Sequence, residues 1–189
     1  MATHLPSPPA NHPPNLWQRM TRLARHRLAE DALRRAFPAD LIDRLTRRVA
    51  ASERRHTGQI RICVEGGLPL SYLWRGASAR DRAVTLFGKQ RVWDTEANNG
   101  VLIYLLEADH AIEIVADRGL ARHVAPDTWQ ALVAQMGEAF RAGRHEEGLT
   151  QALSEVSALL VVHFPSGTGP DGSEGRNNEL PDHPVIGRK

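Results

Sequence analysis

Two apolar runs constrain the fold of this chain more than any other feature. Residues 99–106 and 111–119 are rich in Val, Leu, Ile and Ala, and a short polar break at residues 107–110 separates them. The first run alternates poorly between apolar and polar side chains, which is typical of a strand covered on both faces. Two such runs joined by a few polar residues predict a β-hairpin.

The composition fits one compact domain with tails. The 189 residues are 41% hydrophobic, which is enough for a core. The single cysteine, Cys63, excludes an internal disulfide framework, and we interpret it as a buried, inert thiol. No segment resembles a secretory signal or approaches the apolar length of a membrane span. We therefore expect a soluble cytoplasmic protein.

The chain divides into a tail, a basic helix, a domain and a second tail. Residues 1–14 contain five prolines and are expected to be disordered. Residues 15–37 predict a basic helix, and residues 38–165 predict an α/β/α domain. Residues 166–189 are rich in Gly, Pro, Asn and Asp and predict a mostly irregular tail, in which residues 178–182 could dock on the domain.

The remaining pattern predicts the element order α-α-β-α-β-β-α-α. A helix from about Ala39 to His56 precedes a strand that alternates over residues 59–65. Residues 68–75 fit either an irregular loop or a short edge strand. Ser78 and Asp81 have the spacing of a capping box at the start of a third helix.

Two further helices follow the hairpin, and together these elements predict the fold class. Pro126 begins one helix, and the pattern of the next runs from Leu149 to Leu160. A helix between the first strand and the hairpin favours a right-handed crossover and a parallel strand pair. We therefore predict a three-layer α/β/α sandwich with a small mixed sheet, built from one helix crossover and one β-hairpin.

The sequence lacks the motifs of several large functional classes. It contains no GxGxxG or GxxxxGK[ST] for nucleotides, and no HExxH, CxxC or GxSxG. Its nine histidines have no metal-pair spacing, and no stretch interleaves aromatic with basic residues as an RNA-binding sheet does. We therefore expect no nucleotide, haem or zinc and no nucleic-acid partner.

Carboxylate and amide oxygens, by contrast, gather at the ends of the predicted strands. Such groups suit Ca²⁺ or Mg²⁺, and open α/β sheets bind ligands at strand ends. If the first two strands are parallel, Asp117 lies toward Asn99 and Asp94, whereas Glu65 lies toward Glu107 and Asp109. The alternative is that these residues only cap turns and helix starts.

An arginine within the first strand also needs an explanation. Arg61 points from a sheet that we predict to be covered, so it requires a partner. The carboxylates of Glu53 and Asp117 are the candidates. A structural ion pair explains Arg61 better than a catalytic role does.

In their order along the chain, several segments resemble the TPM domain family, named after a thylakoid lumen phosphatase-like protein, a photosystem repair protein and a receptor modulator. The resemblance covers roughly residues 40–182 and is strongest to the compact bacterial branch. It rests on residues 57–61, 99–104, 114–120, 148–149, 163–165 and 178–180, and on these motif residues: Glu53, Thr57, Gly58, Arg61, Thr95, Gly100, Gly119 and Trp129.

The resemblance implies an α/β/α sandwich and three kinds of role. Family members are described as acid phosphatases, as Ca²⁺ or Mg²⁺ binders, or as accessory factors of membrane-protein complexes. Bacterial relatives are associated with LemA-type membrane proteins. This sequence departs from the family at Gln59, where Glu is common, at His110, where Arg is common, and at Asp117, where many members have Gly.

Two hypotheses place chemistry at the strand ends. The first is a divalent-cation-binding accessory or adaptor module, linked to membrane-protein or envelope function, with a metal held by Asp94, Asn99, Asp117 and Glu179. The second is a metal-dependent acid phosphatase in which Asp117, Arg118 and Arg61 supply parts of the site. The sequence shows no nucleophile motif, which makes the second hypothesis the weaker one.

A third hypothesis concerns the basic helix. Its residues Leu16, Trp17, Met20 and Leu23, together with its arginines, could lie on an anionic membrane surface or on a membrane-protein partner. The protein would then be peripheral at the inner membrane. The alternative, which the interruption of the basic face by Glu30 and Asp31 favours, is that this helix packs on the domain.

Overall fold

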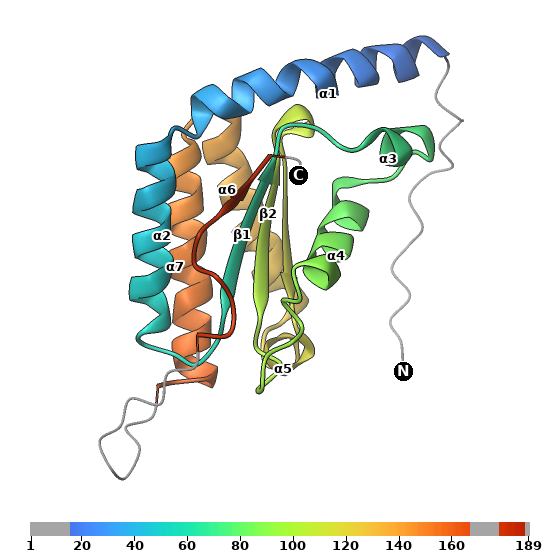
Figure 1. Cartoon of the computed structure of the whole chain (residues 1–189). Coiled ribbons are helices and arrows are strands. Elements are labelled where there is room, and N and C mark those ends of the chain that lie inside the picture. Colours follow the sequence, from blue (N-terminus) through green and yellow to red (C-terminus); the bar gives the residue numbers. More distant parts are fainter. Residues whose placement is uncertain (1–15, 167–177, 188–189) are drawn as a thin grey trace, which may run out of the picture.

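The computed structural model describes residues 16–166 and 178–187, so the predicted tail at residues 1–14 lies outside it. A four-stranded sheet of order β3-β2-β1-β4 forms its centre. The strands are β1 (Ile60–Glu65), β2 (Val101–Leu106), β3 (Ala111–Ala116) and β4 (Val185–Ile186). Helices cover both faces of this sheet (Figure 1). The predicted three-layer α/β/α sandwich is confirmed.

The register of the strands follows the predicted crossover and hairpin. β1 runs parallel to β2, with Ile60 opposite Val101, and β3 runs antiparallel to β2, with Val101 also opposite Ala116. All six residues of β1 and of β2 are buried. Because both faces are covered, these strands need continuous apolar runs rather than an alternation.

The two faces of the sheet pack against different helices. α2 (Ala39–Glu53), α6 (Pro126–Arg141) and α7 (His145–His163) share a core cluster with Ile62 and Ile103. On the other face, α3 (Leu70–Trp74) and α4 (Ala79–Lys89) pack around Cys63, Leu102 and Tyr104. Figure 1 shows α2 and α7 side by side on one side of the strands and α4 on the other.

The structure corrects some local predictions and confirms others. Residues 68–75 contain the short helix α3, neither a loop nor a strand; Pro69 presets its first turn, and its carbonyl accepts from the amides of Tyr72 and Leu73. The capping box is present, since Ser78 and Asp81 exchange hydrogen bonds. The second helix ends at Glu53 rather than near His56.

The C-terminal segment adds a strand that the sequence did not reveal. β4 pairs parallel to β1, with Val185 opposite Cys63 and Ile186 opposite Val64. Ahead of it, Leu180 is 5% exposed and packs into the α3–α4 core. A two-residue strand has no periodicity of its own, so only its docking on β1 defines it.

The first helix, α1 (Leu16–Ala36), lies across the end of the sheet at which β1 and β2 finish (Figure 1). Its buried side chains His26, Ala29 and Leu33 face the domain. A Cβ atom on Gly67 would come within 2.3 Å of the carbonyl oxygen of His26, so the absence of a side chain there permits the close crossing. No helix formed by the described residues is both long and apolar enough to cross a membrane.

Candidate functional site

Asp117 directly follows β3. It lies at the end of the sheet at which β1 and β2 begin, and we use "edge" below for this end. Its main-chain amide donates to the carbonyl of Gly100 at 2.8 Å. Its Oδ1 accepts a 2.7 Å hydrogen bond from the amide of Arg118, which begins the short helix α5 (Arg118–Ala121). The residue is 7% exposed, and its Oδ2 is buried without a hydrogen-bond partner in the part of the chain that the structure describes.

Asn99 ties the loop before β2 to the same edge. It is 1% exposed, and its amide N–H donates to the hydroxyl of Thr95 at 3.0 Å. Its side-chain Nδ2 donates to the hydroxyl of Thr57 at 3.3 Å, across from the start of β1. Thr57 is exposed, so this edge is open to solvent. We call Thr57, Asn99 and Asp117 the polar edge.

Close backbone approaches explain two of the motif glycines. A Cβ on Gly100 would lie 1.9 Å from the carbonyl oxygen of Val92. A Cβ on Gly119 would lie 2.3 Å from the carbonyl oxygen of Asn98 and 2.5 Å from that of Ala97. The loop before β2 therefore presses its carbonyl groups against the polar edge, and no side chain could occupy either glycine position without moving it.

Other motif residues hold the fold around this edge. Glu53 is 1% exposed at the end of α2, and its Oε1 accepts a 2.8 Å hydrogen bond from the first amide of β1, that of Ile60. Gly58 lies beneath Leu160 of α7, with no room for a Cβ. Trp129 of α6 is partly buried against the main core. These residues have structural contacts rather than a place at the polar edge.

The other two expected metal ligands, Asp94 and Glu179, form contacts of their own in the structure. Asp94 has a 43% exposed side chain and forms an ion pair with Arg91 at 2.5 Å. Glu179 comes from the C-terminal segment, and its Oε2 accepts from the amide of Glu96 at 3.0 Å. Within the described ranges, no three His, Cys, Asp or Glu residues are grouped so that they could hold a metal ion together.

Arg61 binds carbonyl groups instead of the expected carboxylates. Its guanidinium donates to the carbonyl oxygens of Pro181 and, at 2.9 Å, His183. Burial lowers the pKa of Arg61. Its side chain lies on the face of the sheet where the C-terminal segment returns, whereas Glu53 reaches the sheet from α2 on the other face. The pairing with Glu53 or Asp117 was therefore a wrong expectation.

The opposite end of the sheet, at which β1 and β2 finish, holds the carboxylates of Glu107 and Asp109, as the parallel pairing of these two strands predicts. Asp109 lies 3.2 Å from His26 Nε2 and contacts two arginines of α1. Burial alone would raise the pKa of Asp109, but these basic neighbours hold it at about 2. Glu107 Oε2 lies 3.1 Å from His145 Nε2, and this hydrogen bond lowers the pKa of Glu107. Both carboxylates are engaged in holding helices.

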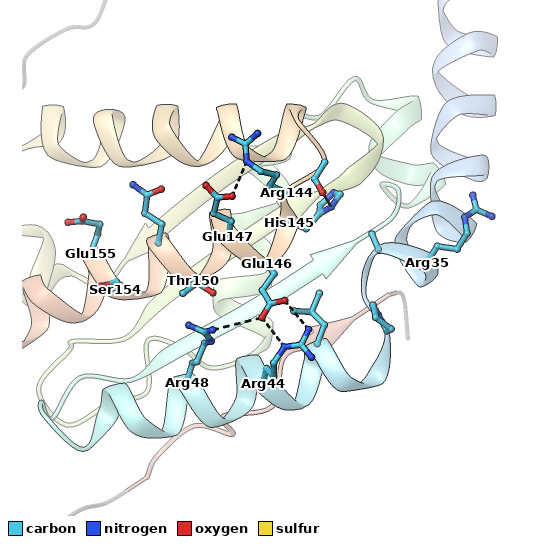
Figure 2. A pocket seen from close by; sticks show the side chains of 15 residues that line it. Arg35, Arg44, Arg48, Arg144, His145, Glu146, Glu147, Thr150, Ser154 and Glu155 are labelled. Carbon is cyan, nitrogen blue, oxygen red and sulfur yellow. Dashed lines mark hydrogen bonds and ion pairs between the residues drawn. The ribbon is translucent and has the colours of Figure 1, made fainter.

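An open groove of about 900 Å³ runs between α2 and the start of α7 (Figure 2). Arg44 donates from Nε and Nη2 to Glu146 at 2.8 and 2.9 Å. Arg48 lies 3.9 Å from the same carboxylate, and Arg144 lies 2.9 Å from Glu147. These guanidinium groups are neutralised by carboxylates, which argues against an anion site here. The sequence did not suggest this groove, because its walls are distant in the chain.

Comparisons with known proteins agree with this fold. A family model described as "TPM domain" matches residues 34–159, which is more than half of the chain. The chain resembles the NMR structure of protein BA42 from Bizionia argentinensis, with a TM-score of 0.66 and 24% identity over 80% of this chain and 95% of that one. It also resembles the N-terminal domain of a protein from P. gingivalis, with a TM-score of 0.53 and 19% identity over 68% and 80% of the two chains. A search of curated proteins found no match.

Proposed function

From the premise that the chain belongs to the TPM domain family, we propose that it is a divalent-cation-binding accessory module whose cation binds at the polar edge. One observation carries this proposal: the carboxylate of Asp117 is buried, and its Oδ2 has no hydrogen-bond partner among the described atoms. A buried carboxylate oxygen without a partner is costly, and a bound cation would offset that cost.

The surrounding groups are oxygen donors of the kind that Ca²⁺ and Mg²⁺ accept. The loop before β2 brings the carbonyl groups of Ala97 and Asn98 against Gly119, two residues after Asp117. Glu179 reaches the same loop through the amide of Glu96 and would add a second carboxylate from the C-terminal segment. With one buried carboxylate and mainly neutral oxygens, we expect weak binding, with a dissociation constant on the order of 10⁻³ M.

This arrangement supports binding better than phosphoryl transfer. A phosphatase site needs positive groups that converge on the transferred phosphoryl group. Arg61 is occupied by carbonyls of the C-terminal segment, and the side chain of Arg118 is exposed beyond the cap of α5. Within the described part of the chain, neither arginine side chain forms a hydrogen bond with the carboxylate of Asp117, so hydrolysis of a phosphate ester is not the function we infer.

The test is a titration of the full chain with CaCl₂ and with MgCl₂, followed by backbone amide shifts. We expect shifts confined to residues 95–100, 117–120 and 178–180. Asp117→Asn keeps the size of the side chain and removes its charge, so it should abolish these shifts. Asp94→Asn is the matched control, because Asp94 is exposed and paired with Arg91, and it should titrate like the parent.

Two results would contradict the proposal. Shifts that persist in Asp117→Asn would mean that the cation binds elsewhere. The absence of any localised shift at millimolar metal would exclude a cation site. Glu179→Gln separates the roles of the two carboxylates: a weaker but localised response would assign Glu179 as an additional ligand. A chromogenic phosphate ester assayed with the same samples would reveal any hydrolysis that depends on Asp117.

A further inference from the structure

The helix α1 carries apolar side chains on two opposite sides. His26, Ala29 and Leu33 are buried against the domain. The other side exposes Trp17 and Leu28, with exposed fractions of 75% and 72%. A helix that only covers a domain has one apolar stripe and an outer face of polar residues. Within residues 16–166 and 178–187, this outer side of α1 therefore has no packing role.

The spacing of the exposed residues makes them one surface. Trp17, Met20, Ala24 and Leu28 follow one another at intervals of three and four residues, which keeps them on a common side of the helix. Met20 is 56% exposed, and Ala24 is exposed as well. We call these four residues the outer stripe.

The charge near the outer stripe is mainly positive. α1 contains six arginines and two acidic residues, Glu30 and Asp31, of which Asp31 follows Leu28 by three positions on the same side of the helix. Arg27 is exposed beside Leu28, and the side chain of Arg25 is 57% exposed although it also contacts Asp109. Apolar residues that include a tryptophan, flanked by exposed arginines, form the pattern of helices that lie in the interface of anionic membranes.

The inner contacts hold this surface in place. Arg22 donates to the carbonyl of Ala77 at 3.0 Å, and the amide of Leu68 donates to His26 Nδ1 at 3.0 Å. The carboxylate of Asp109 anchors the same part of α1 from the hairpin connection. The helix is thus already folded and fixed on the domain, and docking would not have to order it.

We propose that the outer stripe of α1 docks the protein on an anionic lipid surface. Charge complementarity decides the occupant: phospholipid headgroups with negative charge match the exposed arginines, and the headgroup–acyl boundary accepts Trp17, Met20 and Leu28. This inference is independent of the cation site, since α1 crosses the end of the sheet opposite to the polar edge (Figure 1).

The experiment is flotation of the full chain with phosphatidylcholine vesicles, with and without phosphatidylglycerol. We expect binding to the anionic vesicles only, weakened by added salt because the arginines are exposed. The double variant Trp17→Ser, Leu28→Ser should bind about tenfold less, since it removes the largest apolar groups of the outer stripe. Trp93→Ser is the matched control: Trp93 is 50% exposed in the loop before β2, at the end of the sheet away from α1, and its replacement should leave vesicle binding unchanged.

Four results would overturn the proposal. Equal binding of the double variant and the parent would exclude the outer stripe, and an equal loss of binding in Trp93→Ser would indicate a non-specific apolar effect. Absence of flotation with anionic vesicles would exclude a lipid surface. Sedimentation of the lipid-free parent as a dimer that Trp17→Ser, Leu28→Ser dissociates would instead assign the face to a second copy of the chain. Because all three positions are exposed, these substitutions should leave the circular dichroism spectrum unchanged. Recording that spectrum checks that each variant is folded.

Discussion

The carboxylate of Glu65 at the end of β1 and the guanidinium of Arg82 on α4 form a buried, two-point ion pair. Arg82 Nε donates to Glu65 Oε2 at 2.8 Å and Nη2 donates to Oε1 at 2.5 Å, with side-chain exposures of 9% and 5% for Arg82 and Glu65. The hydroxyl of Tyr104 donates to the same Oε2 at 2.9 Å. The hydrogen bond to Glu65 raises the pKa of Arg82, so its guanidinium stays charged.

Removal of one partner from this pair should be costly. Arg82→Leu leaves a buried carboxylate without its counter-ion, and we expect the free energy of unfolding to fall by about 3–5 kcal/mol. The double variant Glu65→Leu, Arg82→Leu removes both charges and should recover part of that loss. Urea denaturation of the two variants measures the difference. A loss below about 1 kcal/mol in Arg82→Leu would mean that the pair contributes little.

Gly119→Ala should loosen the loop before β2. The added Cβ meets the carbonyl oxygens of Asn98 and Ala97 at 2.3 and 2.5 Å, and backbone atoms cannot rotate away. We expect a loss of about 1–3 kcal/mol, with faster amide exchange in residues 95–100. Gly88→Ala is the control, because nothing lies within 4 Å of its Cβ in helix α4. It should raise stability by about 0.5–1 kcal/mol.

The stability of the α1 contact should depend on acid pH. Burial opposes ionisation of Asp109, but its contacts with His26 and with the arginines of α1 hold its pKa at about 2, below the ordinary value of 3.8. A carboxyl group with a lower pKa in the folded state stabilises it above the unfolded pKa, and this contribution disappears as the pH falls from about 4 to about 2. After solvent screening we expect on the order of 1 kcal/mol. Asp109→Asn should flatten this part of the pH–stability profile, as measured by thermal unfolding.

Arg61→Ala should release the C-terminal segment from the sheet. The guanidinium donates to carbonyls of Pro181 and His183, and β4 beyond them has only two residues. The amide of Gly187, which donates to Val64 at 2.8 Å, should then exchange with solvent at least tenfold faster. Arg118→Ala serves as the control, because that side chain is exposed. Unchanged exchange at Gly187 in Arg61→Ala would show that strand pairing alone holds the segment.

Cys63 should resist thiol reagents in the native protein. Burial raises the pKa of its thiol to about 12, and the side chain is only 1% exposed between the sheet and the α3–α4 layer. Since the thiolate is the reactive form, labelling at about pH 8 should proceed only through unfolding. Mass spectrometry with and without denaturant tests this expectation. Rapid labelling of the folded protein would indicate that the C-terminal segment opens over Cys63.

Local patterns explain why much of the fold was predictable. The first apolar run predicted a strand covered on both faces, and β2 is fully buried, whereas β3, the second strand of the predicted hairpin, is partly exposed. Ser78 and Asp81 stand at a spacing whose hydrogen bonds form within one turn, so the start of α4 could be predicted without tertiary contacts. By contrast, α3 and β4 are too short to show a period.

The candidate site was predictable only to the level of topology. Antiparallel pairing of β3 with β2 places Asp117 beside Gly100, and parallel pairing of β1 with β2 places Glu65 at the other end of the sheet. The strand order could not predict which carboxylate oxygens would be engaged by hydrogen bonds or ion pairs. Asp94 is paired with Arg91, whereas Asp117 keeps one buried oxygen without a partner in the described structure.

The sequence by itself determined the covered mixed sheet, the hairpin and the capped helices, because these depend on side-chain periodicity and on hydrogen bonds between near neighbours in the chain. Only the tertiary structure decided the ionic partners, since Arg44 reaches Glu146 across 102 residues and Arg61 reaches Pro181 across 120. It also decided which face of α1 is buried, because both faces carry apolar residues and only contact with Gly67 and Asp109 selects one.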